Sequence, residues 1–278
     1  MSTQPQTRAE LRALRGRGVT PGPGEARDAP RVRPRPLVVL GAVLASLLIA
    51  AAAATGERLV EVIAVVLIGL LTAVGWPRLL RSPAPGGSTV VLVVTALALG
   101  LALVLRDVEP FLENVPAALG AGVIGLCLHP LVQAAAREDL AYSLAGNALG
   151  VLVIVAGGVF TSTVVHSASP VVVVGVALAV AALVDLATER PRSAAWMLPV
   201  GMLVGGLAGL GSHGLLEGDL AAWPALLGVL AAGVAVAMRR VLSQQPEIDT
   251  VTGAVTAGAA SVLVVGPIVH LISRLPLA

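Results

Sequence analysis

Histidine and carboxylate side chains near the ends of apolar segments are the residues of this chain best suited to chemistry. Imidazole can bind a metal ion or carry a proton near neutral pH. Three of the four histidines end apolar segments that we predict to open on the same side of a membrane, and two glutamates lie one helical turn inside other segments on that side. Ionisable groups within a bilayer are costly and mark sites by default. The candidate outer-face polar cluster is therefore Glu61, Glu113, His166, His213 and His270.

The spacing of these residues assigns them no definite reaction. The sequence contains no H-x-x-x-H or H-E-x-x-H pair, no G-x-S-x-G elbow and no P-loop, and no G-x-G-x-x-G follows a predicted strand. The single cysteine, Cys127, has no histidine at a metal-binding spacing. We therefore assign no catalytic residue, no metal and no cofactor. Two interpretations of the cluster stay open: a metal or proton site, or glutamates that pair with Arg58 and Arg106 at the membrane interface.

Composition places the elements that carry these residues in a membrane. The chain is 56% hydrophobic and only 12% charged, whereas soluble domains carry about 25% charged residues. Lipid leaves no water for backbone amides, so a helix about 20 residues long is the element that can cross it. We predict an all-α, polytopic membrane helix bundle of about nine transmembrane helices. The predicted spans are 37–54, 58–76, 89–105, 111–133, 142–164, 169–187, 195–213, 220–238 and 250–273.

The arginines indicate which ends of these spans face the cytoplasm. All eighteen basic residues are arginine, and basic residues accumulate on the cytoplasmic side. With the N-terminus in the cytoplasm and the C-terminus outside, all arginines but Arg58, Arg106 and Arg274 fall on the cytoplasmic side. Loop 239–249 then supplies Arg239 and Arg240. We expect a multi-pass protein of the bacterial plasma (inner) membrane.

Residues 1–36 differ from the rest, with eight arginines and six prolines. Such a segment buries too little apolar surface to fold, so we predict a disordered basic cytoplasmic tail that anionic lipid headgroups attract. Residues 37–273 then form the transmembrane helical domain, and 274–278 a short outer C-terminus. We expect no nucleic-acid partner. One alternative is a cleavable signal ending within Ala50–Thr55, which would leave eight spans.

Glycines at intervals of four provide the most specific pattern in the sequence. Such spacing places glycines on one helix face and opens a groove for a neighbouring helix. The contact can be static or can slide as part of a gate. The predicted helix-packing residues are Gly146, Gly150, Gly201, Gly205 and Gly209.

Three classes of function fit these features. The absence of motifs and the presence of packing glycines favour a non-catalytic scaffold or accessory subunit with a membrane-protein partner. The number of spans also fits a small-solute or lipid permease, although carriers driven by ions usually place carboxylates near the midplane, where this sequence has none. A membrane enzyme acting on lipid-linked substrates is the third class, and it would use loop residues such as Glu138, Asp139 and Glu189.

The predicted topology can be tested with a reporter enzyme fused after Ala278. An odd number of spans and a cytoplasmic N-terminus require the C-terminus to lie outside. Alkaline phosphatase at that position should be active, and a cytoplasmic reporter fused at the same position should be inactive. The reverse pattern would contradict the arrangement of all nine spans.

Overall fold

The computed structural model describes residues 35–106, 108–133, 140–187, 196–218 and 221–275, and within them all regular structure is helical. Nine helical spans in this part of the chain are long and apolar enough to cross a membrane, which confirms the prediction. Residues 1–34 of the predicted tail 1–36 lie outside the described residues, as do the loop residues Glu138, Asp139 and Glu189. The helices are α2 Pro36–Ala54, α3 Arg58–Leu79, α4 Pro85–Val104, α5 Val115–Val132, α7 Leu140–Gly158, α8 Phe160–Val164, α9 Ser169–Leu183, α10 Met197–Glu217, α11 Ala222–Leu242, α12 Val251–Leu263 and α13 Gly266–Ser273, with a 3₁₀ turn, η1 Val184–Ala187, extending α9.

Proline begins many of these helices. Proline cannot donate a backbone hydrogen bond, but the first amides of a helix have no intrahelical acceptor, and the fixed φ of proline suits a helix start. Proline occupies the first or second position of α2, α4, α5, α9 and α13. These helix starts can therefore be read directly from the sequence.

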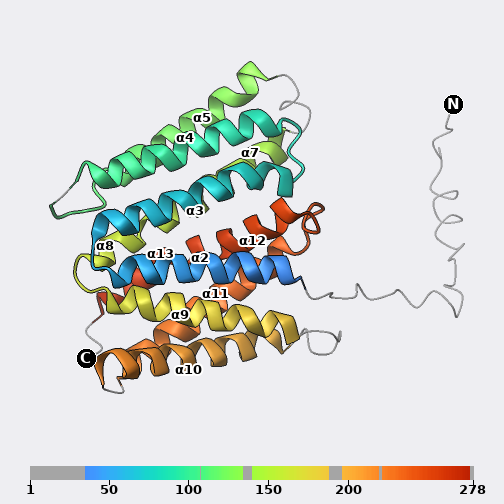
Figure 1. Cartoon of the computed structure of the whole chain (residues 1–278). Coiled ribbons are helices and arrows are strands. Elements are labelled where there is room, and N and C mark those ends of the chain that lie inside the picture. Colours follow the sequence, from blue (N-terminus) through green and yellow to red (C-terminus); the bar gives the residue numbers. More distant parts are fainter. Residues whose placement is uncertain (1–34, 107, 134–139, 188–195, 219–220, 276–278) are drawn as a thin grey trace, which may run out of the picture.

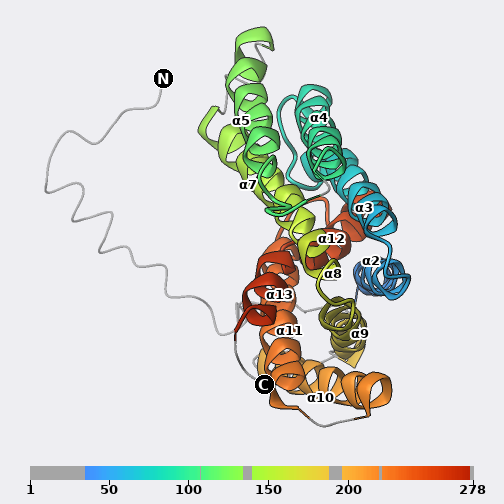
Figure 2. The ribbon, with the colours of Figure 1, turned by 90° about the vertical axis from the view of Figure 1, so that its left-hand side faces the viewer.

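The helices lie side by side with their axes roughly aligned (Figure 1). Viewed from the side, they form an elongated arrangement with α5 at one edge and α10 at the other (Figure 2). Helix α12 lies in the middle, where it packs against α2, α3, α7 and α11, whereas α5 packs against α4 and α7, and α10 against α9 and α11. The core therefore forms around α12.

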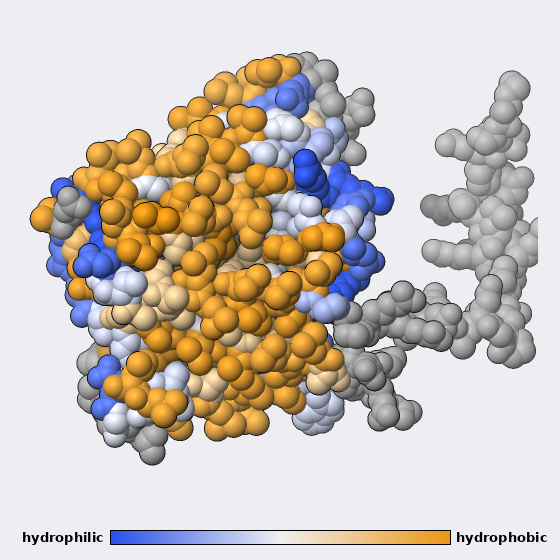
Figure 3. Space-filling model, in the orientation of Figure 1, coloured by the Kyte–Doolittle hydropathy of each residue, from blue (hydrophilic) through white to orange (hydrophobic). Residues whose placement is uncertain are grey.

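The bundle has two ends, named here for one residue at each. The Arg35 end contains the start of α2 and the segment after α11, because the Arg35 guanidinium donates to the Ser243 carbonyl and pairs with Asp249. The His166 end contains the segments after α4 and α8, because His166 pairs with Glu109. Polar surface gathers at both ends, and an apolar band lies between them (Figure 3).

The apolar band contains large side chains that face outward. Leu101 is 60% exposed and Leu203 is 63% exposed, and many other leucines and valines are similarly open. A soluble protein rarely exposes a continuous apolar surface of this kind. The chain is a membrane-embedded protein.

Two of the nine spans are interrupted. The sequence analysis gave both of them, 142–164 and 250–273, as continuous helices. Span five breaks between α7 and α8 at Val159, and span nine breaks between α12 and α13. Pro267 contributes to the second break because it cannot donate to the carbonyl four residues earlier. At the first break the Thr161 and Ser162 hydroxyls donate to the carbonyls of Gly158 and Val159, both at 2.8 Å.

The two interruptions lie against each other. Gly266, the first residue of α13, leaves no room for a side chain, because a Cβ there would meet the Ala156 carbonyl oxygen and lie 3.4 Å from Cδ2 of Phe160. Helix α13 packs on α8. Each broken helix is therefore supported by the other.

Glycines also permit close contact between α10 and α11. A Cβ on Gly205 would lie 2.8 Å from the Gly228 carbonyl oxygen, and one on Gly209 would lie 2.5 Å from the Pro224 carbonyl oxygen. One on Gly201 would lie 2.9 Å from Cγ2 of Val236. In span five, a Cβ on Gly150 would lie 2.9 Å from the Trp76 ring, and one on Gly146 would lie 3.0 Å from Leu80.

Some predicted positions at the span ends are wrong. Helix α11 continues to Leu242, so Arg239 and Arg240 lie in its last turn and not in a loop. Trp76 and Phe160, at the ends of two predicted spans, are both fully buried within the bundle. The Trp76 Nε1 donates to the Gly146 carbonyl at 2.9 Å, which satisfies the polar atom of the ring inside the bundle.

Replacing Gly205 by leucine should destabilise the protein, because the side chain would meet the backbone of α11. Overpacking of this kind costs about 1–3 kcal/mol or more. Gly211→Leu is the matched control on the same helix, since a Cβ there has no neighbour within 4 Å. Thermal unfolding in detergent, followed by size-exclusion chromatography, should show a lower midpoint for Gly205→Leu only. Equal midpoints for the two variants would contradict the close contact.

Candidate functional site

A small polar pocket opens at the His166 end, between α8 and α13. Its volume is about 150 Å³. Except for one proline, every described residue that lines it carries a polar side chain. The lining residues are Ser162, Thr163, His166, Ser167, Pro170, His270, Ser273 and Arg274.

The two histidines of the pocket are joined through Ser162. The Ser162 hydroxyl donates to the Val159 carbonyl at 2.8 Å, and a hydroxyl has one hydrogen to give. The His270 Nδ1, 2.9 Å from the same hydroxyl oxygen, must therefore be the donor in that contact. This hydrogen bond connects α13 to α8 beside the interruptions.

His166 has a hydrogen-bond acceptor at each ring nitrogen. Its Nδ1 lies 3.1 Å from the Ser162 carbonyl oxygen, and its Nε2 lies 2.7 Å from a Glu109 carboxylate oxygen. A carbonyl and a carboxylate both accept, so the two contacts are complete when both nitrogens carry hydrogen. His166 thus connects α8 to the segment after α4.

The other members of the predicted cluster lie apart from this pocket. The Glu113 carboxylate pairs with Arg106. His213 is buried on α10, with its ring 4.8 Å from the Trp223 ring and its Nδ1 3.5 Å from the Ser169 hydroxyl. Of the five predicted residues, the structure places His166 and His270 in one pocket.

Glu61 has the most unusual setting of the five. Its side chain is 0% exposed, and neither carboxylate oxygen has a hydrogen-bond partner in the described part of the chain. Nearby, the Arg58 guanidinium donates to the carbonyls of Leu103 and Arg106 and lies over the Phe111 ring. A buried carboxyl group without partners costs free energy, so Glu61 remains a candidate for function.

A metal centre has no support from this arrangement. Within the described residues, no group of three or more His, Cys, Asp or Glu side chains is placed to hold a metal ion. Protein sites for zinc generally supply at least three such ligands.

No family model, curated protein or solved structure matches this chain.

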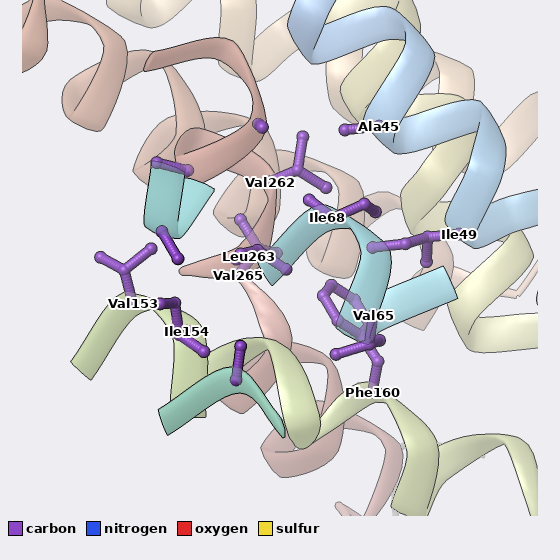
Figure 4. Close-up of a cluster of buried hydrophobic side chains, with 14 of the residues drawn as sticks. Ala45, Ile49, Val65, Ile68, Val153, Ile154, Phe160, Val262, Leu263 and Val265 are labelled. Atoms are coloured by element: carbon purple, nitrogen blue, oxygen red, sulfur yellow. The ribbon is translucent and has the colours of Figure 1, made fainter. Parts of the chain in front are cut away.

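Next to the pocket, at the start of α8, the bundle is filled by apolar side chains. Phe160 lies close to Val65 of α3, in a cluster that also includes Ile154 of α7, Val265, which follows α12, and residues of α2 (Figure 4). Phe160 and Val265 are 0% exposed, and the other members of the cluster are almost as completely buried. This cluster, named here the apolar plug, is Ala45, Ile49, Val65, Ile68, Val153, Ile154, Phe160, Val262, Leu263 and Val265.

The sequence analysis missed a buried ion pair near the Arg35 end. The Arg239 guanidinium, on a side chain that is 4% exposed, donates to Asp185 at 2.6 Å and to the Ser261 hydroxyl at 3.4 Å. These contacts join α11, η1 and α12. Removing one partner of such a buried pair typically costs about 3–5 kcal/mol, so we assign it to stability.

A second missed contact lies between α7 and α4. The amide of Asn147, which is 3% exposed, donates to the Ser88 hydroxyl at 2.9 Å. An asparagine within an apolar span was the available signal, because buried amides in membranes find partners on neighbouring helices. Its partner could not be identified from spacing along the chain.

Proposed function

We propose that the chain is a non-catalytic membrane component, a scaffold or accessory subunit. The apolar plug carries this proposal. A conduit needs water or polar groups through the bilayer centre. In the described structure the apolar plug, which adjoins the pocket through Phe160, consists of buried apolar side chains.

The buried hydroxyl groups of the spans support the same function. Ser46, Thr72 and Thr95 each donate to the carbonyl four residues earlier in the same helix, at 2.7–2.9 Å. Hydroxyls satisfied in this way have no hydrogen left to donate to a solute or to a chain of water molecules. The interior is organised for packing.

The edge helix α5 is the best surface for a partner within the membrane. It is the span with the smallest buried share, and Gly120 on it has open space where a side chain would stand. Small residues let a second helix approach closely in lipid, where packing drives association. Cys127, the single cysteine of the chain, is exposed on this helix and provides a native probe of the surface.

We further propose that the Arg35 end faces the cytoplasm of a bacterial plasma membrane, as the distribution of arginines indicates. The arginine-rich segment before α2 would then meet the anionic inner leaflet. Each arginine near such a surface contributes roughly 1 kcal/mol of attraction.

A permease is the second candidate, and the paired interruptions favour it. Discontinuous helices that meet within a membrane form the substrate sites of many transporters. The α7–α8 and α12–α13 breaks meet in this way, next to a polar pocket. Such a function would require the apolar plug to open during transport.

Photo-crosslinking from Cys127 tests the scaffold proposal. A maleimide–benzophenone probe attached to Cys127 in native membranes should give one discrete adduct of higher mass. The adduct should persist as a complex of fixed stoichiometry when the protein is extracted in a mild detergent. The benzophenone reacts only with molecules close to Cys127, so a crosslinked partner must lie against α5.

The matched control moves the cysteine to α3 at a similar depth. Cys127→Ala/Val74→Cys carries its single thiol on a side chain that is exposed in the wild type, five residues before the end of its helix. This variant should give no discrete adduct. Purification of the wild type as an uncrosslinked monomer would rule out a stable partner on α5.

A further inference from the structure

The pocket between α8 and α13 has the size and lining of an ion site. Its volume of about 150 Å³ is several times the roughly 30 Å³ that one water molecule occupies in the liquid. It is smaller than the 300–1,000 Å³ typical of pockets for drug-sized ligands. A single small ion with a few water molecules fits this space.

The charges at the pocket favour an anion. Among the described residues that line it, none is a carboxylate, whereas Arg274 is a cation. A Glu109 carboxylate oxygen lies 2.7 Å from Nε2 of His166. The Arg274 guanidinium makes no hydrogen bond or ion pair with a described residue, so no group in the described part of the chain neutralises its charge.

Two hydroxyl groups at the pocket have hydrogens to donate. Thr163 is 3% exposed, and its Oγ1 has no hydrogen-bond partner in the described structure. Threonines within helices usually donate to a carbonyl of the preceding turn, and a buried hydroxyl without a partner is destabilising. The Ser167 Oγ accepts from the Ser169 amide at 3.3 Å, which leaves its hydrogen free.

We propose that this pocket binds a small oxyanion such as a phosphate group, held by Arg274, Thr163 and Ser167. Arginine matches the oxygens of a phosphate with paired donors, and the hydroxyls would donate to the remaining oxygens. The ligand is either free inorganic phosphate or the phosphate of an anionic lipid headgroup. The proposal holds whether the chain acts as a scaffold or as a permease, because it concerns binding alone.

The pocket also links the ligand to the fold. His270 of α13 and Ser162 of α8 line it, and their hydrogen bond joins the two short helices that follow the interruptions. An anion held by Thr163 of α8 and by Arg274, just after α13, would connect the same two elements a second time. Binding should therefore stabilise the folded protein by mass action.

The test titrates inorganic phosphate into the purified full chain in phosphatidylcholine nanodiscs, at constant ionic strength with chloride, by isothermal titration calorimetry. A second arm counts retained phosphatidylglycerol molecules by native mass spectrometry after extraction from mixed bilayers. Saturable binding in the first arm supports a free anion, and specific retention in the second arm alone supports a headgroup. Binding in neither arm would overturn the proposal.

Two variants and one control test whether phosphate or the lipid headgroup binds in this pocket. Arg274→Gln and Thr163→Val should each weaken phosphate affinity or lipid retention at least about tenfold, as expected for the loss of a hydrogen bond to a charged group. Arg106→Gln removes an arginine at the same end that pairs with Glu113 outside the pocket, and it should bind as the wild type does. Equal affinity in all four proteins would place the ion elsewhere and refute the site.

Thr163→Val also separates binding from folding. The hydroxyl has no partner in the described structure, so replacing it with a methyl group of similar size should leave the unfolding temperature without phosphate unchanged or higher. Wild-type unfolding should shift upward with phosphate, and that of Thr163→Val should not. An equal shift in both proteins would mean that Thr163 does not hold the ion.

Discussion

Close backbone contact between helices is the constraint on which the rest of this structure depends. Within lipid there is no water to exclude between apolar helices, so association relies on packing and on polar contacts. Gly41 of α2 and Gly258 of α12 face each other's helix so closely that a Cβ on Gly41 would lie 2.7 Å from the Val255 carbonyl oxygen. Gly175 of α9 approaches α2 in a similar way, with a Cβ position 2.8 Å from the Ser46 carbonyl oxygen. Helix α2 is thereby fixed between α9 and α12.

That constraint explains why the chemistry lies at the ends. Helices that touch through backbone leave no room for a polar cavity between them, and the interruptions of spans five and nine are filled by the apolar plug. Beyond Phe160, where α8 and α13 follow the interruptions, a pocket forms at the His166 end. There Ser162 satisfies a carbonyl freed by the break and also accepts from His270. The same irregularity that breaks the helix thus supplies the polar groups of the site.

Much of the fold could be predicted from the sequence because each span is a local feature. Length and hydropathy define nine helices, and prolines such as Pro36 and Pro85 mark where helices begin. The break in span five was missed because Gly157 and Gly158 are common within membrane helices and indicate no break by themselves. The end of α11 was misplaced because Arg239 looks like a loop residue until its buried partner Asp185 is known.

The site was predictable only in part, for a related reason. His166 and His270 are recognisable as polar residues at span ends, but their meeting depends on how α13 packs against α8. His213 satisfies the same sequence criterion, yet lies against Trp223 on a different helix pair. Thr163 gave no signal in the sequence, since what distinguishes it is an unsatisfied hydroxyl, which exists only in the folded protein.

The most direct test of the scaffold proposal measures whether water reaches the core of the bundle. In a Cys127→Ala background, single cysteines at Ala260 and at Val262, a member of the apolar plug, would stand at sites that are 0% and 1% exposed, and one at Leu275 would stand at a site that is 50% exposed. Thiolates react with maleimide where water reaches them. In native membranes the cysteine at 275 should be modified by N-ethylmaleimide, and those at 260 and 262 should stay unmodified until the protein is denatured. Modification at 260 or 262 at the rate seen at 275 would show a hydrated path through the bundle and contradict the dry core on which the scaffold proposal depends.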